Sequence, residues 1–418
     1  MMDAGYAHLA DALLRSGVIG DPWVEGAPRF ATQPVVITPQ DERRFHDVAR
    51  ALCTAFDAVG RLCAADPALV DERLALTRTQ ALVWRASHPH WHGLARADLF
   101  TTSDGLRACE LNCDTPTGEA EAVLLNRLLL PAHPGTRDPN AGLEEAFTAM
   151  VEGYARAVLA PGALPGTAAI LYPTEITEDL SLVRLYRGWL QARGWRVLLG
   201  SPFNLQPGAH GSVEVFGQRV DLVLRHYKTD GWTERTPAWD NEPPFADPEP
   251  LVGALGLLLQ ATLDGKCAVV NPFGSVLAQN KRTMALLWEE LARLPAAAQD
   301  VVRAHLPLTV RLETLAVAQL LEERMRWVLK SDYGAEGAEV VSGAHVTEPE
   351  WRAAVAHAIP RRWVAQERFT PLVDARGESI NMGVFVAAGE PCGLYARLQA
   401  GPTDGTARSA AVLVQEDA

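Results

Sequence analysis

The chain has 418 residues, of which 48% are hydrophobic and 21% are charged. This length predicts two or three packed units, and the composition is that of an ordinary globular protein. The formal net charge is −13, and the sequence has no basic stripe of the kind that binds nucleic acid. We therefore expect no nucleic-acid partner. An acidic balance would suit a cationic substrate, but it is also common among soluble enzymes.

The six cysteines are scattered and form no Cys-x-x-Cys pair. This pattern favours reduced thiols in the cytoplasm over a disulfide framework. No run of 18 apolar residues is present, so we expect no transmembrane helix and no membrane partner. The first residues are polar and mixed, unlike a secretion signal. Together these features predict a cytoplasmic protein.

The first 90 residues are predicted to be mainly helical, with a long amphipathic helix from Pro39 to Ala64. Residues 94–113 are predicted to form two short strands. A helix is expected at residues 117–130, followed by a loop that begins at Pro131.

A strand–helix–strand order begins near Gly166 and indicates a parallel α/β layer. The helix is expected at Glu178–Arg193. The expected strands are Ala168–Tyr172, Trp195–Leu199, Val220–His226 and Cys267–Asn271.

The last part of the chain is predicted to hold a helix at Arg282–Leu294 and further strands. From Gly401 onward the residues are polar and small, which predicts a mobile loop and tail. The expected strands are Trp327–Lys330, Trp363–Glu367, Met382–Ala387 and Gly393–Leu398.

The hairpin at 94–113 is expected to turn through a three-residue loop at 103–105. Gly105 would supply the left-handed conformation that such a loop needs. In this register Thr102 faces Leu106, which fixes the pairing along both strands.

That register places four polar side chains on one face, with Asp98 opposite Glu110 and Arg96 opposite Asn112. Facing Cβ atoms lie about 4.5–5.5 Å apart, so the carboxylates repel unless a positive charge lies between them. Arg96 offsets part of this repulsion, and Mg²⁺ would offset more because these oxygens are hard donors. A salt-bridge ladder on a solvated face is the alternative. The opposite face is apolar and carries Ala97, Leu99, Cys109 and Leu111.

The segment after the hairpin contains two threonines just before the predicted helix. Thr115 or Thr117 could cap that helix, with Glu121 as an acid in its first turn. A helix N-terminus also binds anions such as a carboxylate, and one of the two threonines would remain free for that purpose.

Two lysines stand where they could reach phosphate oxygens. Lys281 lies close to the start of a helix, and Lys330 ends an apolar strand before a loop that contains Gly334 and Gly337. Such a lysine can bind phosphate while the loop closes over it. The alternative for each lysine is a solvated end of a helix or strand.

Two late strands offer further candidate residues. The strand that ends in Gln366 and Glu367 could face an adenine and a ribose, or it could be an ordinary edge strand. Arg397 lies on a later strand and could bind a carboxylate or phosphate with two hydrogen bonds.

Taken in order, these segments resemble the glutathionylspermidine synthetase family, which belongs to the circularly permuted members of the ATP-grasp superfamily. The resemblance covers roughly residues 90–400, and the joint order of its pieces is more specific than any single piece. Its strongest part is Arg96-Ala97-Asp98 followed by Glu110-Leu111-Asn112-Cys113-Asp114-Thr115-Pro116-Thr117, and looser matches are Asn271-Pro272 to Asn280-Lys281, Leu329-Lys330 to Gly337, Val364-Ala365-Gln366-Glu367 and Gly393 to Arg397.

The resemblance implies an ATP-dependent carboxylate–amine ligase that forms an acyl phosphate and releases ADP and phosphate, with ATP and Mg²⁺ as cofactors. It implies a multi-unit α/β (α+β) fold: a helical region with the metal-binding hairpin at 1–165, a pre-ATP-grasp α/β substrate domain at 166–275 and an ATP-grasp nucleotide-binding region at 276–418. The implied roles are catalysis for Arg96; Mg²⁺ binding for Asp98, Glu110 and Asn112; ATP binding for Lys281, Lys330, Gly334, Gly337, Gln366 and Glu367; and substrate binding for Thr115, Thr117, Glu178 and Arg397.

The substrates are expected to be a small carboxylate and a small amine, but the sequence does not name them. The family's polyamine-binding acids map poorly, with Glu178 or Asp179 as the best match. The oligomeric state also stays open. Two other functions remain possible from sequence: a non-catalytic nucleotide-binding protein, and a peptide ligase of a specialised-metabolite pathway.

A zinc site is a further alternative. His88, His90 and His92 alternate along the chain, so on a strand they would share one face and could ligate a metal. No fourth ligand is evident, and the other interpretation is a proline-containing loop packed against aromatic side chains.

Overall fold

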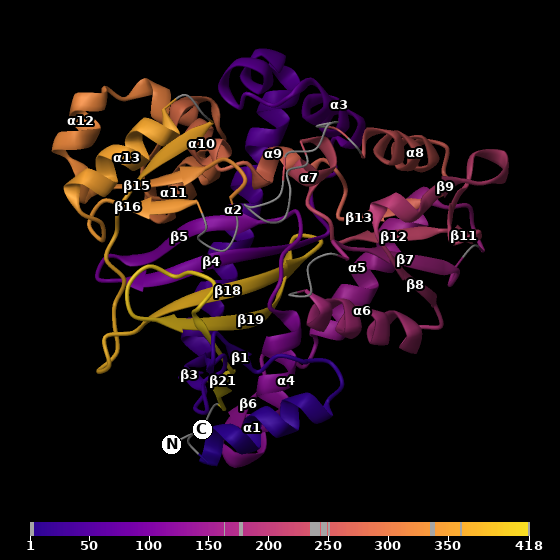
Figure 1. The fold of residues 1–418 in the computed structure, drawn as a ribbon, viewed down its shortest axis with the longest axis horizontal. Helices are drawn as coiled ribbons and strands as arrows, with labels where there is room; N and C mark the ends of the chain where they lie inside the picture. The colour runs from indigo at the N-terminus through magenta and orange to yellow at the C-terminus, as the bar shows by residue number, and fades with distance from the viewer. Residues whose placement is uncertain are drawn as a thin grey trace.

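The computed structural model describes residues 4–162, 164–174, 179–234, 243, 249, 251–334, 339–359 and 362–416. Two predicted site residues, Glu178 and Gly337, lie outside these residues. Figure 1 shows a central sheet with an α/β layer on one side and a second, smaller α/β unit on the other.

The central sheet is antiparallel and joins two hairpins that are far apart in sequence (Figure 1). Asp98 of the first hairpin pairs with Gly383 of the second, so the middle strands of both hairpins meet along their length. The strand order is β20 (Arg408–Ala410), β19 (Glu390–Gln399), β18 (Ser379–Ala387), β4 (Leu94–Thr102) and β5 (Gly105–Asn112).

The predicted register of the β4–β5 hairpin is correct at the end that holds Asp98 and Glu110 and wrong at its turn. Thr102 faces Gly105 and not Leu106, so the loop has two residues rather than three. A register shift at Cys109 then restores the expected pairing of Asp98 with Glu110. Such a β-bulge places two residues opposite one on the partner strand and re-aims the side chains beyond it.

The parallel layer has the strand order β13 (Ala268–Val270), β12 (Leu222–Arg225), β7 (Thr167–Leu171) and β8 (Arg196–Gly200). All of its pairings are parallel, as the predicted strand–helix–strand order requires. Helices α5 (Leu143–Val158), α6 (Leu180–Ala192) and α8 (Val252–Leu263) contact this layer, which lies to the right in Figure 1.

The second α/β unit has the strand order β14 (Thr309–Arg311), β17 (Trp363–Glu367), β15 (Trp327–Ser331) and β16 (Val340–Ser342). Buried Trp327, Trp351 and Leu329 belong to a core cluster of its own. The helices around it are α10 (Arg282–Glu289), α11 (Ala296–His305), α12 (Val317–Glu322) and α13 (Glu348–Ala358).

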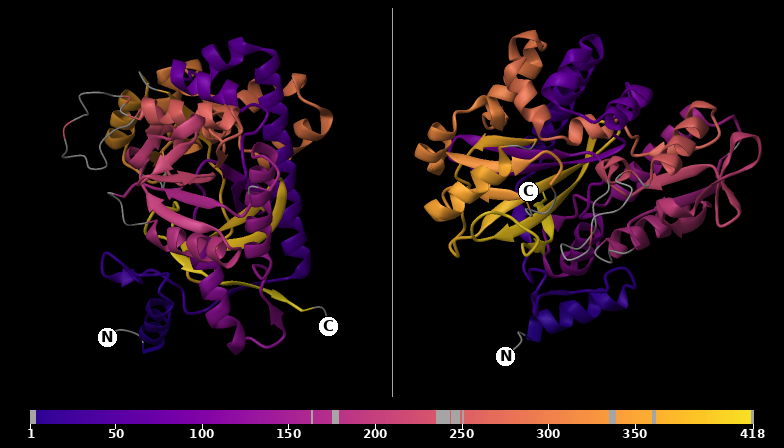
Figure 2. Two further views of the ribbon diagram at one scale, coloured as in Figure 1. Left: turned by 90° about the vertical axis from the view of Figure 1, so that its right-hand side faces the viewer. Right: turned by 45° about the horizontal axis from the view of Figure 1, so that its top comes forward.

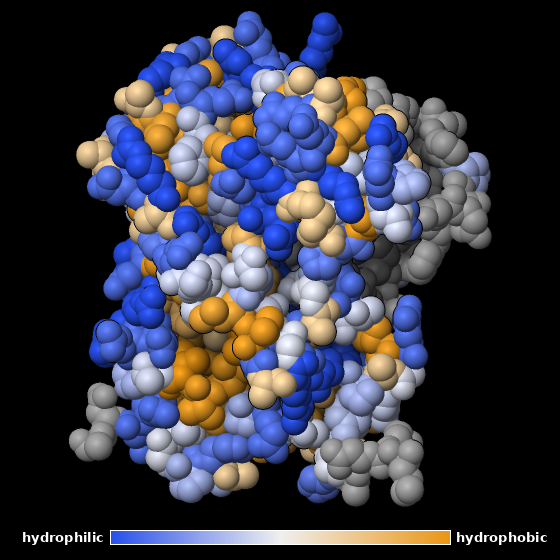
Figure 3. Space-filling model, turned by 90° about the vertical axis from the view of Figure 1, so that its left-hand side faces the viewer, coloured by the Kyte–Doolittle hydropathy of each residue, from blue (hydrophilic) through white to orange (hydrophobic). Residues whose placement is uncertain are grey.

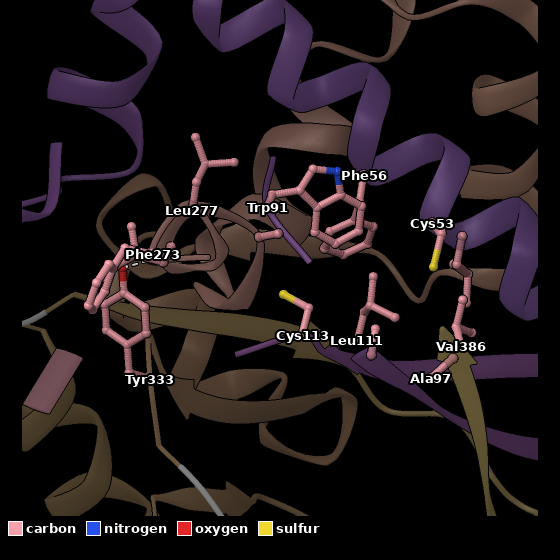
Figure 4. Packing of buried hydrophobic residues seen from close by; sticks show 14 of the residues in the cluster. Cys53, Phe56, Trp91, Ala97, Leu111, Cys113, Phe273, Leu277, Tyr333 and Val386 are labelled. Atoms are coloured by element: carbon pink, nitrogen blue, oxygen red, sulfur yellow. Dashed lines mark hydrogen bonds between the residues drawn. The ribbon is translucent and has the colours of Figure 1, made fainter. Parts of the chain in front are cut away.

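Helix α2 (Pro39–Ala65) covers the apolar face of the central sheet. Thr38 and Asp41 form a capping box at its start, and Pro39 occupies the first turn, as the sequence predicts. Figure 4 shows Cys53 and Phe56 above Leu111 within the same cluster. The face predicted to be apolar is therefore buried, and the opposite face of the sheet is left for polar side chains.

Residues 408–415 form two strands, which contradicts the mobile tail predicted from Gly401 onward. Strand β21 (Val412–Gln415) pairs with β3 (Val35–Ile37) and β6 (Thr136–Arg137). Its first three residues are buried, so the short apolar run is a core strand. Helix α1 (Ala4–Arg15) packs at the same end, where its Leu9 and Leu13 join Ala411 in one cluster (Figure 2).

The remaining helices and strands include the helices α3 and α4 and several shorter elements. They are β1 (Trp23–Val24), β2 (Ala27–Pro28), α3 (Arg78–Ser87), α4 (Glu119–Leu129), β9 (Leu205–Pro207), β10 (Val213–Val215), β11 (Gln218–Val220), α7 (Thr229–Thr233) and α9 (Ser275–Gln279).

The surface is mixed in character. Figure 3 shows a face that is hydrophilic over most of its area, with a hydrophobic patch in its lower half. Within the described ranges, no helix combines the length and the apolar character needed to cross a membrane.

Candidate active site

One cavity of about 740 Å³ lies where the central sheet, the parallel layer and the β14–β17 unit meet. It collects residues that the sequence predicted from separate segments. Those that line it are Arg96, Glu110, Asn112, Thr115, Thr117, Lys281, Lys330, Gly334, Gln366, Glu367 and Arg397. Asp98 lies beneath them and is fully buried.

Asp98 is the centre of a buried ion-pair network. Arg96 contacts both of its carboxylate oxygens, with Nε 2.6 Å from Oδ1 and Nη2 2.9 Å from Oδ2. Arg397 donates to Oδ2 from 2.8 Å. Both arginines are thereby fixed on the polar face of the sheet, because a bidentate guanidinium–carboxylate pair restricts orientation.

Glu110 is held between two lysines. Lys281 Nζ lies 3.6 Å from Glu110 Oε2, and it also donates to the carbonyl of Gly334 from 2.6 Å. Lys330 donates to the carbonyl of Cys109, the bulged residue next to Glu110. Burial alone would raise the pKa of Glu110, but Lys281 and Lys330 lower it to about 2. Glu110 is therefore an anion at every physiological pH.

The three predicted metal ligands fit a magnesium ion in the chemistry of their donors. Asn112 lies beside both carboxylates, with Nδ2 3.1 Å from Glu110 Oε1 and 3.3 Å from Asp98 Oδ2. Carboxylate and amide oxygens are the hard donors that Mg²⁺ prefers together with phosphate oxygens. Glu110 and Asn112 line the cavity, whereas Asp98 contacts the two arginines.

Arg96 is positioned by close packing as well as by charge. A Cβ atom at Gly383 would lie 2.8 Å from Arg96 Cδ, so only glycine leaves room for this side chain. The guanidinium lies over the ring of Tyr395, 5.8 Å from its centroid, and it also donates to the carbonyl of Thr117. These contacts aim Arg96 at the Thr115–Thr117 loop.

The two threonines before α4 do not cap it, which corrects the predicted caps. The residue at the N-cap is Gly118, with φ 110°, and it makes no side-chain capping bond. A Cβ at Gly118 would collide with the Tyr395 ring at 2.6 Å, so glycine is needed here for both conformation and space. Thr115 and Thr117 both line the cavity instead.

The turn between the hairpin and this loop is anchored by a buried network that sequence reasoning missed. Asp114 accepts from Arg225, Ser275 and Thr229. Burial raises the pKa of Asp114, but Arg225 lowers it further, so the carboxylate is charged. The sequence could point only to Asp114, because this residue lies within the family motif. Its three partners lie more than 100 residues further along the chain, so their contact with it could not be predicted.

Gln366 and Glu367, at the end of β17, also line the cavity. Gln366 is buried and donates to Thr309 from 3.1 Å, and Glu367 pairs with Arg326. Asn381, opposite Arg397 in the central sheet, also lines the cavity, and its buried Oδ1 has no hydrogen-bond partner among the described residues. The apolar residues that line the same cavity include Phe100, Phe369, Pro371, Val373 and Pro402.

The histidines proposed for zinc do not share a face. Residues 88–93 form no strand, and the three rings contact different aromatic side chains: Trp84 for His88, Tyr154 for His90 and Trp91 for His92. Burial lowers the pKa of His92 to about 4. In the described part of the chain, no group of three His, Cys, Asp or Glu side chains could hold a metal ion.

The C-terminal part of the chain matches a known protein family. Residues 247–414 match the model described as "Glutathionylspermidine synthase preATP-grasp". The chain is similar to the glutathionylspermidine synthetase family. This confirms the resemblance predicted from the sequence, although the matched segment begins after the β4–β5 hairpin. None of the curated proteins matches the sequence significantly.

Comparison with solved structures confirms the predicted mixed α/β fold class and is consistent with a circularly permuted ATP-grasp. A glutathione synthetase-like effector from Globodera pallida in apo form aligns with TM-score 0.58 and 12% identity, over 98% of this chain and 96% of that chain. A γ-glutamylcysteine synthetase-like protein from Methylobacillus flagellatus KT aligns with TM-score 0.47 and 14% identity, over 84% of each chain.

Proposed function

We propose that this chain is an ATP-dependent carboxylate–amine ligase that forms an acyl phosphate and releases ADP and phosphate. The observation that carries the proposal is the convergence in one cavity of Arg96 and Arg397, which bind Asp98, with Lys281 and Lys330, which lie beside Glu110. Phosphoryl transfer depends mainly on alignment and on neutralisation of negative charge, which such a cluster supplies.

The cavity divides naturally into three parts. Lys281 and Lys330 would bind the ATP phosphates beside Glu110, with Gly334 in the loop that adjoins them. Gln366, Glu367 and Asn381 would face the purine and ribose, because an orphaned buried amide oxygen needs a donor. Gly337 lies outside the described residues, so its role in the same loop stays a prediction.

The carboxylate substrate would bind at the opposite part of the cavity. Thr115 and Thr117 would donate to its oxygens, and Arg96 would stabilise the charge that develops when the phosphoryl group arrives. Arg397 would hold an anionic group of the substrate from beside Asp98. Asp98, Glu110 and Asn112 would hold Mg²⁺, which would neutralise phosphate charge when bound.

A screen of ADP release tests this proposal. Carboxylates should be crossed with amines, including amino acids, short peptides and polyamines, in the presence of Mg²⁺ and ATP. The proposal predicts ADP release that requires both co-substrates. If ATP binds but ADP forms with no pair, the chain is a non-catalytic nucleotide-binding protein.

A further inference from the structure

The cavity wall next to the Thr115–Thr117 loop carries a histidine–aspartate pair that the proposed reaction has not used. His226 directly follows β12, and Asp179 directly precedes α6. Their side chains meet with His226 Nε2 3.0 Å from Asp179 Oδ2. Both residues line the same cavity as Arg96.

Among the residues that the structure describes, three charged groups act on His226. Asp179 precedes α6, Glu119 lies in the first turn of α4, and Arg225 ends β12. Arg225 is already paired with Asp114. Asp179 is thus the charged partner in contact with the imidazole, whose side chain is itself only 6% exposed.

The chemistry of amide formation requires a proton acceptor at this point. A primary amine is an ammonium ion at neutral pH and has no lone pair until one proton leaves. The free nitrogen then attacks the acyl carbon, a C–N bond forms, and the C–O bond to phosphate breaks with its electrons on the phosphate. The second proton leaves with that phosphate as HPO₄²⁻, so the first proton needs a base on the protein.

We propose that His226 is the catalytic base that takes this first proton from the amine, and that Asp179 is a positioning residue for its imidazole. The proposal rests on the ligase function above. Because Nε2 lies 3.0 Å from Asp179 Oδ2, a hydrogen on Nε2 would be attracted to the carboxylate, and Nδ1 would carry the lone pair that accepts a proton.

The electrostatics of the pair support this role. Burial lowers the pKa of His226, but the charge and hydrogen bond of Asp179 raise it above the ordinary value, and Glu119 adds to the rise. A raised pKa makes the imidazole a stronger base towards an ammonium ion. Amide formation should therefore fall as pH falls through this pKa, because His226 is then already protonated.

Hydroxylamine separates the proton step from the rest of the reaction. It is largely unprotonated at neutral pH, and it traps acyl phosphates as hydroxamates without needing a base. The experiment compares wild type with His226→Asn, using the carboxylate and amine that release ADP fastest in the screen, and then hydroxylamine in place of that amine. His210→Asn is the matched control, because His210 is exposed in a turn with φ 55° that asparagine adopts readily.

The proposal predicts that His226→Asn lowers amide formation by about 100-fold or more and loses the pH dependence, while hydroxamate formation stays within about threefold. Asp179→Asn should lower amide formation less and shift the pH profile to lower pH. Equal amide formation in wild type and His226→Asn overturns the assignment of His226 as the base. A parallel loss of amide and hydroxamate formation in His226→Asn also overturns it. Absence of both products in wild type overturns the ligase function itself.

Discussion

The Oδ2 atom of Asp98 lies 2.8 Å from Nη2 of Arg397, 299 residues further along the chain. This contact ties the two hairpins of the central sheet together on the face that lines the cavity. Because Asp98 is fully buried and also binds Arg96, one carboxylate sets the position of two cations.

Substitution of Asp98 should therefore disrupt the site more than a simple ligand loss would. Asp98→Asn keeps the shape but leaves Arg96 and Arg397 without their shared charge. We expect turnover in the ADP-release assay to fall at least 100-fold, as for Arg96→Ala, while circular dichroism shows a folded protein. Asp47→Asn, at an exposed position of α2, is the control. Near-normal turnover in folded Asp98→Asn would contradict both the metal assignment and this network.

Gly383 offers a test of how Arg96 is positioned. The Cβ of Gly383→Ala would approach Arg96 Cδ to 2.8 Å, so the guanidinium must shift away from Asp98. We expect kcat to fall about tenfold or more, with a smaller effect on ATP binding measured by calorimetry. The control is Gly188→Ala in α6, where an added Cβ meets nothing within 4 Å. Equal kcat in both variants would mean that Arg96 tolerates displacement.

Asn271 is predicted to be a stability centre. Its side chain makes five hydrogen bonds, to the backbone of Gly93, Leu94, Cys113 and Asp114, and so joins the parallel layer to both strands of the hairpin. Asn271→Ala leaves these buried groups unpaired and should lower the free energy of unfolding by about 3 kcal/mol or more. Urea unfolding measures this change, and Gln260→Ala on exposed α8 should differ from wild type by less than about 0.5 kcal/mol.

The buried carboxyl of Glu119 predicts a pH-dependent stability. Burial raises the pKa of Glu119 from 4.5 to about 7, so the native state holds a proton that the unfolded chain releases. The contribution of the Glu119 side chain to the free energy of unfolding is fully present below pH 4.5 and is lost as pH rises through about 7. Glu119→Gln should thus be more stable than wild type at pH 8, by up to about 3 kcal/mol, and nearly equal to it at pH 4.5. If urea unfolding shows a stability difference between Glu119→Gln and wild type that does not change with pH, the raised pKa of Glu119 is refuted.

The sequence predicted the pairing of Asp98 with Glu110 for a partly incorrect reason. A three-residue loop was assumed, whereas the structure has a two-residue loop and a bulge at Cys109, and the two errors cancel. A bulge leaves no clear trace in the alternation of polar and apolar residues. Cys109 was accordingly placed on the apolar face, but it lines the cavity next to Lys330.

Contacts between distant segments set the other limit of prediction. The helices and parallel strands were predictable because their apolar spacing is local. The pairing of His226 with Asp179 was not, because it depends on how a strand end and a helix start meet in the fold. The buried strand Val412–Gln415 was missed because its short apolar run follows a polar stretch.

The central sheet also has a consequence for biosynthesis. Strands β4 and β5 leave the ribosome early, but their sheet partner β18 begins only at Ser379. Until then the edge of β4 and the polar face with Asp98 and Glu110 lack their native neighbours. Long-range pairing of this kind folds slowly and exposes strand edges to aggregation. We expect nascent chains that stop before Ser379 to depend on chaperones, and the cavity to form only when the last strands are made.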